Sequence, residues 1–166
     1  MAFSSNTPQN YEQLSYGPPN GSMWRGQARQ IISEAVATRT LVGKEAGAAC
    51  LFDVASGVVY TLPAPVAGMT FEFWVTTTIT SNSAKIITDA ATTFLLGEVL
   101  TYTTATASPA GFAFNGSTHV ACTMNGTTTG GIIGTKVRVT ALSSTVWWIE
   151  GVVVGSGTIA TPAATS

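Results

Sequence analysis

The chain has 166 residues and a mass of 17.1 kDa, the usual size of one domain or of one domain with an arm. Seven basic and eight acidic side chains leave a net charge of −1, and only 9% of the residues are charged, against about 25% in an ordinary soluble domain. Without a basic excess to neutralise phosphates, nucleic-acid binding is not expected. With one histidine and two cysteines, a cysteine/histidine metal cage is not expected either, so we predict no cofactor and no enzymatic activity.

The two cysteines, Cys50 and Cys122, lie far apart in the sequence and form no C-x-x-C pair. We expect buried free thiols, because free cysteine packs as a small hydrophobe. The first ten residues have neither the basic nor the apolar region of a secretory signal, and the longest apolar stretch, residues 41–75, is interrupted by charges and prolines. We therefore expect a protein that is made in the cytoplasm and has no partner in the membrane.

Residues 1–30 are predicted to form an extended N-terminal arm. Three prolines with several asparagines and glycines leave no room for a long strand or helix in the first 24 residues. Residues 25–37 fit helical and alternating spacing equally well, so a short helix and a first strand both remain open there. Aromatic and arginine side chains dominate interface energetics. The candidate anchors and polar contacts of the arm are Tyr11, Tyr16, Trp24, Arg25 and Arg29.

Residues 31–157 are predicted to form a β-rich domain, and residues 158–166 a short C-terminal tail that acts as a second arm. Short segments rich in threonine, valine and aromatics, separated by turn residues, are typical of an all-β fold, here an antiparallel β-sandwich or barrel. The expected strands are 48–54, 58–62, 69–78, 85–89, 94–103, 111–114, 118–124, 132–142 and 146–154. The first two of these, joined by Ala55-Ser56-Gly57, are predicted to form a hairpin.

Residues that could carry chemistry are sparse. On the predicted strand 118–124, the odd spacing of His119 and Cys122 sends the two side chains to opposite faces, which excludes a local catalytic pair. The acids of the β-rich domain, among them Glu72, Glu98 and Glu150, lie on different strands, and we interpret them as solvated surface residues.

The tryptophans are more informative. In segment 69–78, Phe71, Phe73 and Val75 share one face, which places Trp74 on the other, polar face. Trp147 and Trp148 are adjacent, so one of the two must leave the core face. Large indoles outside the core mark contact surfaces, so we predict a homo-oligomer, in the form of a trimer, with Trp74 or the Trp147/Trp148 pair at the subunit contact. A sugar-binding site on the same tryptophans is the main rival interpretation.

Residues 56–75, SGVVYTLPAPVAGMTFEFWV, resemble a pattern found in tailed-bacteriophage virion proteins. In that pattern a strand, a Leu-Pro-x-Pro stop, a small-residue turn with glycine and a Phe-x-Phe strand follow one another. The lead-in Arg39-Thr40-Leu41 and the turn Lys44-Glu45-Ala46-Gly47 extend the resemblance to about forty residues. The motif is structural, and it carries no catalytic residues to transfer.

The resemblance implies a structural protein of the virion, and many such proteins are capsid decoration (cement) proteins. A fibre tip needs a trimeric stalk with heptads or β-helix repeats, and neither is visible in this chain. We therefore expect a protein on the outer capsid surface that cross-bridges neighbouring copies of the major capsid protein. The alternative is a phage fibre or tail component, or a receptor- or carbohydrate-binding module.

Overall fold

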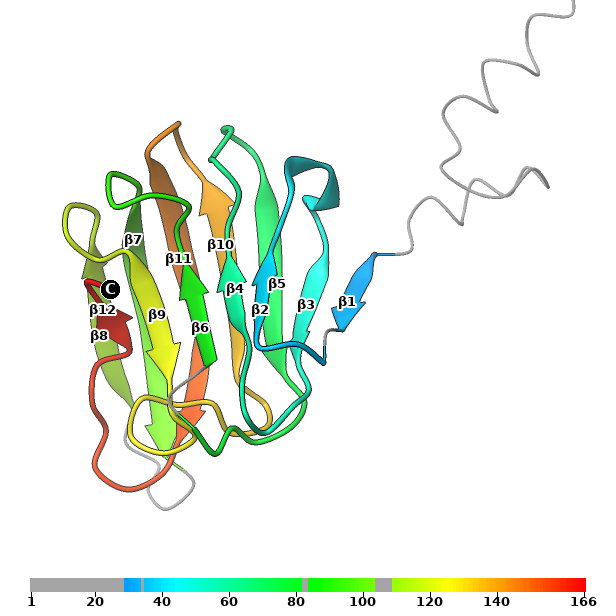
Figure 1. Ribbon diagram of the computed structural model, residues 1–166. Coiled ribbons are helices and arrows are strands. Elements are labelled where there is room, and N and C mark those ends of the chain that lie inside the picture. The colour runs from blue at the N-terminus through cyan, green and yellow to red at the C-terminus, as the bar shows by residue number, and fades with distance from the viewer. Residues whose placement is uncertain (1–28, 34, 82–83, 104–108) are drawn as a thin grey trace, which may run out of the picture.

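The computed structural model describes residues 29–33, 35–81, 84–103 and 109–166, and these residues form the all-β sandwich expected from the sequence (Figure 1). One sheet has seven strands in the order β1-β3-β5-β10-β11-β7-β8. Their bounds are Ile31–Ser33, Ala49–Phe52, Thr70–Val75, Lys136–Ala141, Val146–Gly155, Phe94–Thr103 and Ala110–Asn115. The other sheet has five strands in the order β12-β9-β6-β4-β2, with bounds Ala163–Ala164, Ala121–Met124, Ala84–Ile87, Val59–Thr61 and Thr38–Thr40. A short 3-10 helix, η2, spans Gly43–Glu45.

The first six strands alternate between the two sheets, so that β1, β3 and β5 pair in parallel in one sheet and β2, β4 and β6 pair in parallel in the other. The remaining pairs are antiparallel except for β7 with β11, which is parallel. The sandwich therefore has mixed sheets, where the sequence pattern had predicted antiparallel ones.

The predicted hairpin over residues 48–62 is wrong, because β3 and β4 lie in different sheets and the residues between them form an arch. The reason is visible in the core. The rings of Phe52 on β3 and Tyr60 on β4 meet edge to face at 5.2 Å, and the Tyr60 hydroxyl donates a hydrogen bond of 2.8 Å to the Leu51 carbonyl. Because both strands are rich in apolar residues, each is more stable on its own side of the shared core than beside the other in one sheet.

The core lies between the sheets and contains the predicted face of β5. Phe71, Phe73 and Val75 are all buried, as their alternation indicates. The Phe71 ring packs against Trp147 of β11 at a centroid distance of 6.1 Å. Burial of each large apolar side chain stabilises the fold by about 1.5–3 kcal/mol.

Both ends of the described chain join the sheets. Of the two interpretations of residues 25–37, the strand is the one observed, as β1 at Ile31–Ser33. The C-terminal tail is not a free arm along its whole length, because Ala163 and Ala164 pair with β9 as the edge strand β12. Within the described residues, no helix has the length and apolar character needed to cross a membrane.

Candidate functional site

The outward side of the seven-stranded sheet, which we call the outer face, carries a row of charges across four neighbouring strands. In the register of the sheet, Arg138 on β10 lies directly opposite Glu72 on β5 and opposite Glu150 on β11. Glu150 in turn lies opposite Glu98 on β7. Because side chains alternate along a strand, these four residues point away from a core formed by their neighbours in sequence.

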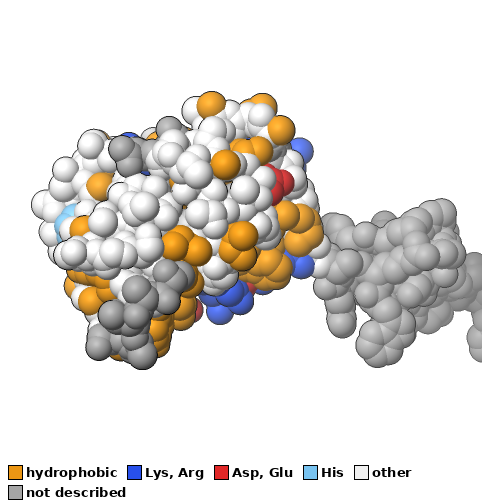
Figure 2. All heavy atoms as spheres, turned by 90° about the horizontal axis from the view of Figure 1, so that it is seen from below, with side chains coloured by type: hydrophobic (Ala, Val, Ile, Leu, Met, Phe, Trp, Pro, Cys, Tyr) orange, Lys and Arg blue, Asp and Glu red, His pale blue; other side chains and the backbone are white. Residues whose placement is uncertain are grey.

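A second row of outward-pointing side chains, displaced by two residues along each strand, is mainly apolar. It consists of Trp74 on β5, Lys136 on β10, Val152 on β11 and Leu100 on β7. Val152 and Leu100 are 39% and 42% exposed, and Trp74 is half-buried. Seen from below, hydrophobic and basic side chains gather along the lower side of the domain (Figure 2). A protein with few charges thus exposes a largely apolar strip beside its charged row.

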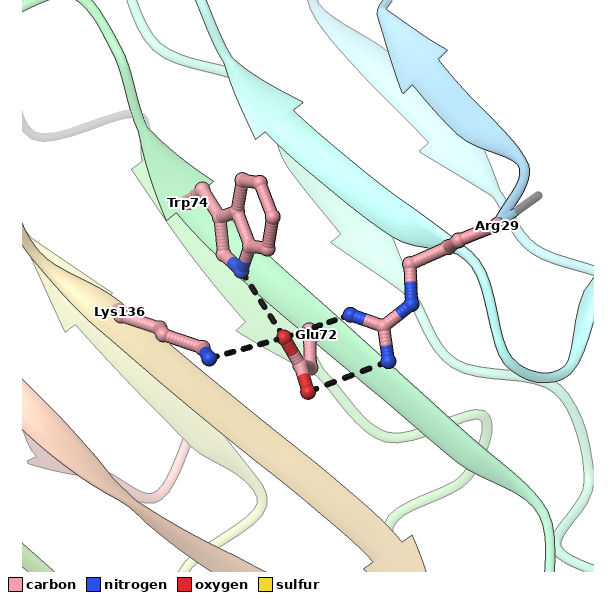
Figure 3. A network of polar contacts seen from close by, with 4 residues as sticks. All are labelled: Arg29, Glu72, Trp74 and Lys136. Atoms are coloured by element: carbon pink, nitrogen blue, oxygen red, sulfur yellow. Dashed lines mark hydrogen bonds and ion pairs between the residues drawn. The ribbon is translucent and has the colours of Figure 1, made fainter. Parts of the chain in front are cut away.

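Glu72 is the centre of a polar network on this face (Figure 3). Its carboxylate accepts from both terminal nitrogens of Arg29, with Nη1 at 2.7 Å and Nη2 at 3.2 Å. Lys136 Nζ lies 3.2 Å away and the Trp74 indole Nε1 donates at 3.1 Å. Although the Glu72 side chain is only 11% exposed, its charge is fully compensated. The hydrogen bond from Arg29 is the main cause that lowers the pKa of Glu72 to about 2.

A second indole–carboxylate pair lies on the other side of Arg138. There the Trp148 Nε1 donates to Glu150 Oε2 at 3.2 Å. Arg138 and Glu98 are exposed, and within the described residues neither has an ion pair within 4 Å. Among the described residues, the outer face therefore holds a cation and an anion that have no ion pair. A groove of about 440 Å³ runs between the two pairs, lined by Glu72, Lys136, Arg138, Glu150, Gly151 and Val152.

The structure places four of the predicted contact residues as follows. Trp74 and Trp148 both lie on the outer face and are half-buried. Trp147 is fully buried, so its predicted place at a subunit contact is wrong. The strand β11 turns successive side chains to opposite sides, and Trp147 is the one that faces the core. Arg29 forms an ion pair with Glu72 of its own domain.

The other predicted arm residues, Tyr11, Tyr16, Trp24 and Arg25, lie outside the described residues. Sequence analysis did not single out Lys136 or Arg138, and it interpreted Glu72, Glu98 and Glu150 as scattered. Their convergence depends on strand order and register. The only local signal was a glutamate two residues from a tryptophan, which occurs on both β5 and β11.

Neither cysteine joins the outer face. Cys50 and Cys122 are buried free thiols, as expected, and burial raises the pKa of each to about 12. The His119 Nδ1 accepts from the Asn115 backbone N–H at 3.1 Å, within the turn after β8. In the part of the chain that the structure describes, no group of three or more possible metal-ligating side chains comes together.

Comparisons of the chain with protein-family models, with curated proteins and with solved structures found no match.

Proposed function

We propose that this protein is a bacteriophage capsid decoration protein that binds the outer capsid surface and cross-bridges neighbouring major capsid subunits. The observation that carries a structural role is the outer face, where the half-buried Trp74 and Trp148 lie beside exposed aliphatic side chains on one continuous sheet. Exposed apolar side chains that gather on one face are typical of contacts between proteins. The resemblance of residues 56–75 to tailed-bacteriophage virion proteins is the reason for proposing a phage capsid as the binding partner.

The proposed mechanism is mechanical. Residues 1–30 attach to the shell, and the β-rich domains associate with one another as a homo-oligomer. Several weak attachments then act together, because each bound arm raises the effective concentration of the next one. Bridges between adjacent capsid subunits increase the work needed to separate them under the internal pressure of packaged DNA. Low charge favours this role, since few charged groups lose water when surfaces meet.

Deletion of residues 1–24 tests this proposal. The truncated protein is expected to fold and to associate like the full chain but to lose binding to phage particles that lack their own copy, measured by co-sedimentation. The full-length chain is the matched control. If truncation leaves particle binding intact and dissociates the oligomer, the arm holds the oligomer together and the attachment surface lies on the β-rich domain.

A carbohydrate-binding module is the second candidate, and one observation favours it. The groove on the outer face is open and combines carboxylates with Lys136 and Arg138, close to the half-buried Trp74. Sugar sites combine an aromatic plane with such polar groups. A glycan array with the full chain tests this function: binding that is lost in Trp74→Ala supports it, and the absence of binding to every glycan counts against it.

A further inference from the structure

We propose that the outer face is the interface of a twofold dimer, in which the occupant of each face is the outer face of a second copy of this chain. The inference goes beyond decoration of a shell and does not depend on it. The observation that leads to it is the pair of unmatched charges. Arg138 and Glu98 are exposed without an ion pair among the described residues, and Glu98 stands directly opposite another acid, Glu150. Like charges opposite each other destabilise a sheet unless a cation lies nearby.

A second copy supplies the missing partners when the twofold axis runs parallel to the strands, between β10 and β11. Rotation about such an axis does not change the position of a residue along the strands. Each row therefore faces the same row of the partner, and β10 faces the partner's β11. Arg138 then faces the partner's Glu150, and the reverse contact forms by symmetry. The next strands outward, β5 and β7, face each other in the same way, which places Glu72 opposite the partner's Glu98. Arg29, which is 38% exposed on its side of Glu72, thereby comes toward the partner's Glu98.

The same arrangement matches the apolar row with itself. Trp74 on β5 faces the partner's Leu100 on β7, and Lys136 on β10 faces the partner's Val152 on β11. The stem of a lysine covers apolar surface well, and the Lys136 ammonium group already lies 5.5 Å from the Trp74 ring centroid. In this orientation Arg138 meets the partner's Glu150 and Leu100 meets the partner's Trp74, while Glu72, which faces the partner's Glu98, brings its own counter-ion Arg29 to that contact.

The size of the face is also sufficient. Strands lie about 4.8 Å apart and rise about 3.3 Å per residue, so β5, β10, β11, β7 and β8, with 6, 6, 10, 10 and 6 residues, cover roughly 600 Å². This is at the lower end of the area that each partner contributes to a standard stable interface. The sequence alone predicts a trimer, whereas the charge pattern of the outer face fits a pair.

The test is a charge exchange in the full-length protein, followed by sedimentation equilibrium over about 1–100 µM. The wild type is expected to be a dimer. Arg138→Glu places an acid against the partner's Glu150, and Glu150→Lys places a base against the partner's Arg138. Each variant alone is expected to raise the dissociation constant about 10-fold or more. An equimolar mixture restores opposite charges at both contacts, so it is expected to form a heterodimer with nearly the wild-type dissociation constant.

Lys44→Glu, a charge reversal at an exposed residue of η2, is the matched control and is expected to leave the dimer unchanged. Circular dichroism checks the fold of each variant, and Leu100→Lys replaces any charge variant that does not fold. A monomeric or trimeric wild type overturns the proposal. So does a dimer that is insensitive to both charge reversals, or a mixture that does not recover. A monomer that still binds phage particles overturns the dimer and the association of the β-rich domains, and leaves the proposed binding to the capsid standing.

Discussion

Replacement of Glu72 by glutamine tests the polar network at the point where the N-terminal segment joins the sheet. The substitution keeps the shape of the side chain but removes the charge that Arg29 and Lys136 share. The pKa of Glu72 falls from 4.5 to about 2 in the folded protein, which corresponds to about 3 kcal/mol of stabilisation without screening. Its cationic partners are 38% and 57% exposed, so solvent weakens both pairs. We expect Glu72→Gln to lower the free energy of unfolding by about 1–2 kcal/mol at pH 7.

The stabilisation by Glu72 is expected to decrease as the pH falls. Because the folded-state pKa is lowered, the stabilisation by Glu72 is fully present above pH 4.5 and is lost as the pH falls toward 2. Urea unfolding of wild type and variant across this range is expected to show a gap in stability that closes on acidification. Asp89→Asn, at an exposed aspartate that follows β6 and lies outside the outer face, is the control and is expected to change the stability at pH 7 by less than about 0.5 kcal/mol. Equal stability of wild type and Glu72→Gln at pH 7, or a gap that does not change with pH, would refute the reasoning.

Three further predictions concern the core. Trp147→Ala is expected to lower the free energy of unfolding in urea by about 3–5 kcal/mol, because the indole is fully buried. Trp148→Ala is expected to lower it by less than about 1.5 kcal/mol, because this indole is only half-buried. Similar losses would contradict the assignment of the two side chains to opposite faces. Gly126→Ala is expected to prevent folding or to lower the free energy of unfolding by more than about 3 kcal/mol, because φ is +76° and a Cβ would lie 1.6 Å from the Ile79 carbonyl oxygen. Soluble yield and urea unfolding measure this effect, and a stable variant would contradict the geometry. Cys50 and Cys122, whose pKa values burial raises to about 12, are expected to resist iodoacetamide in the native protein and to react in urea, as mass spectrometry would show; alkylation of the native protein would disagree with their burial.

Local patterns predicted strand positions and faces well. The strand at 94–103 has the bounds expected from its apolar run, and the alternation in 69–78 identified the buried side of β5 correctly. These features depend on residues within a few positions of one another, where side-chain alternation and turn residues decide the outcome. Alternation also indicated that Trp147 and Trp148 separate, although it could not tell which of the two enters the core.

Pairing between distant strands was beyond local patterns. The segments around Ala55-Ser56-Gly57 have the composition of a hairpin, and only packing across the core places them in two sheets. The outer face depends on the same long-range order, because β10 must enter between β5 and β11 before Arg138 can lie between two glutamates. Arg29 reaches Glu72 only once β1, β3 and β5 are aligned.

An electron cryomicroscopy map of the intact phage particle tests the proposed decoration role most directly. The account predicts density for the β-sandwich on the outside of the shell, above contacts between neighbouring major capsid subunits, with residues 1–30 lying along those subunits. Density for the sandwich at a fibre or tail, or a shell whose outer surface lacks it, would contradict the proposal.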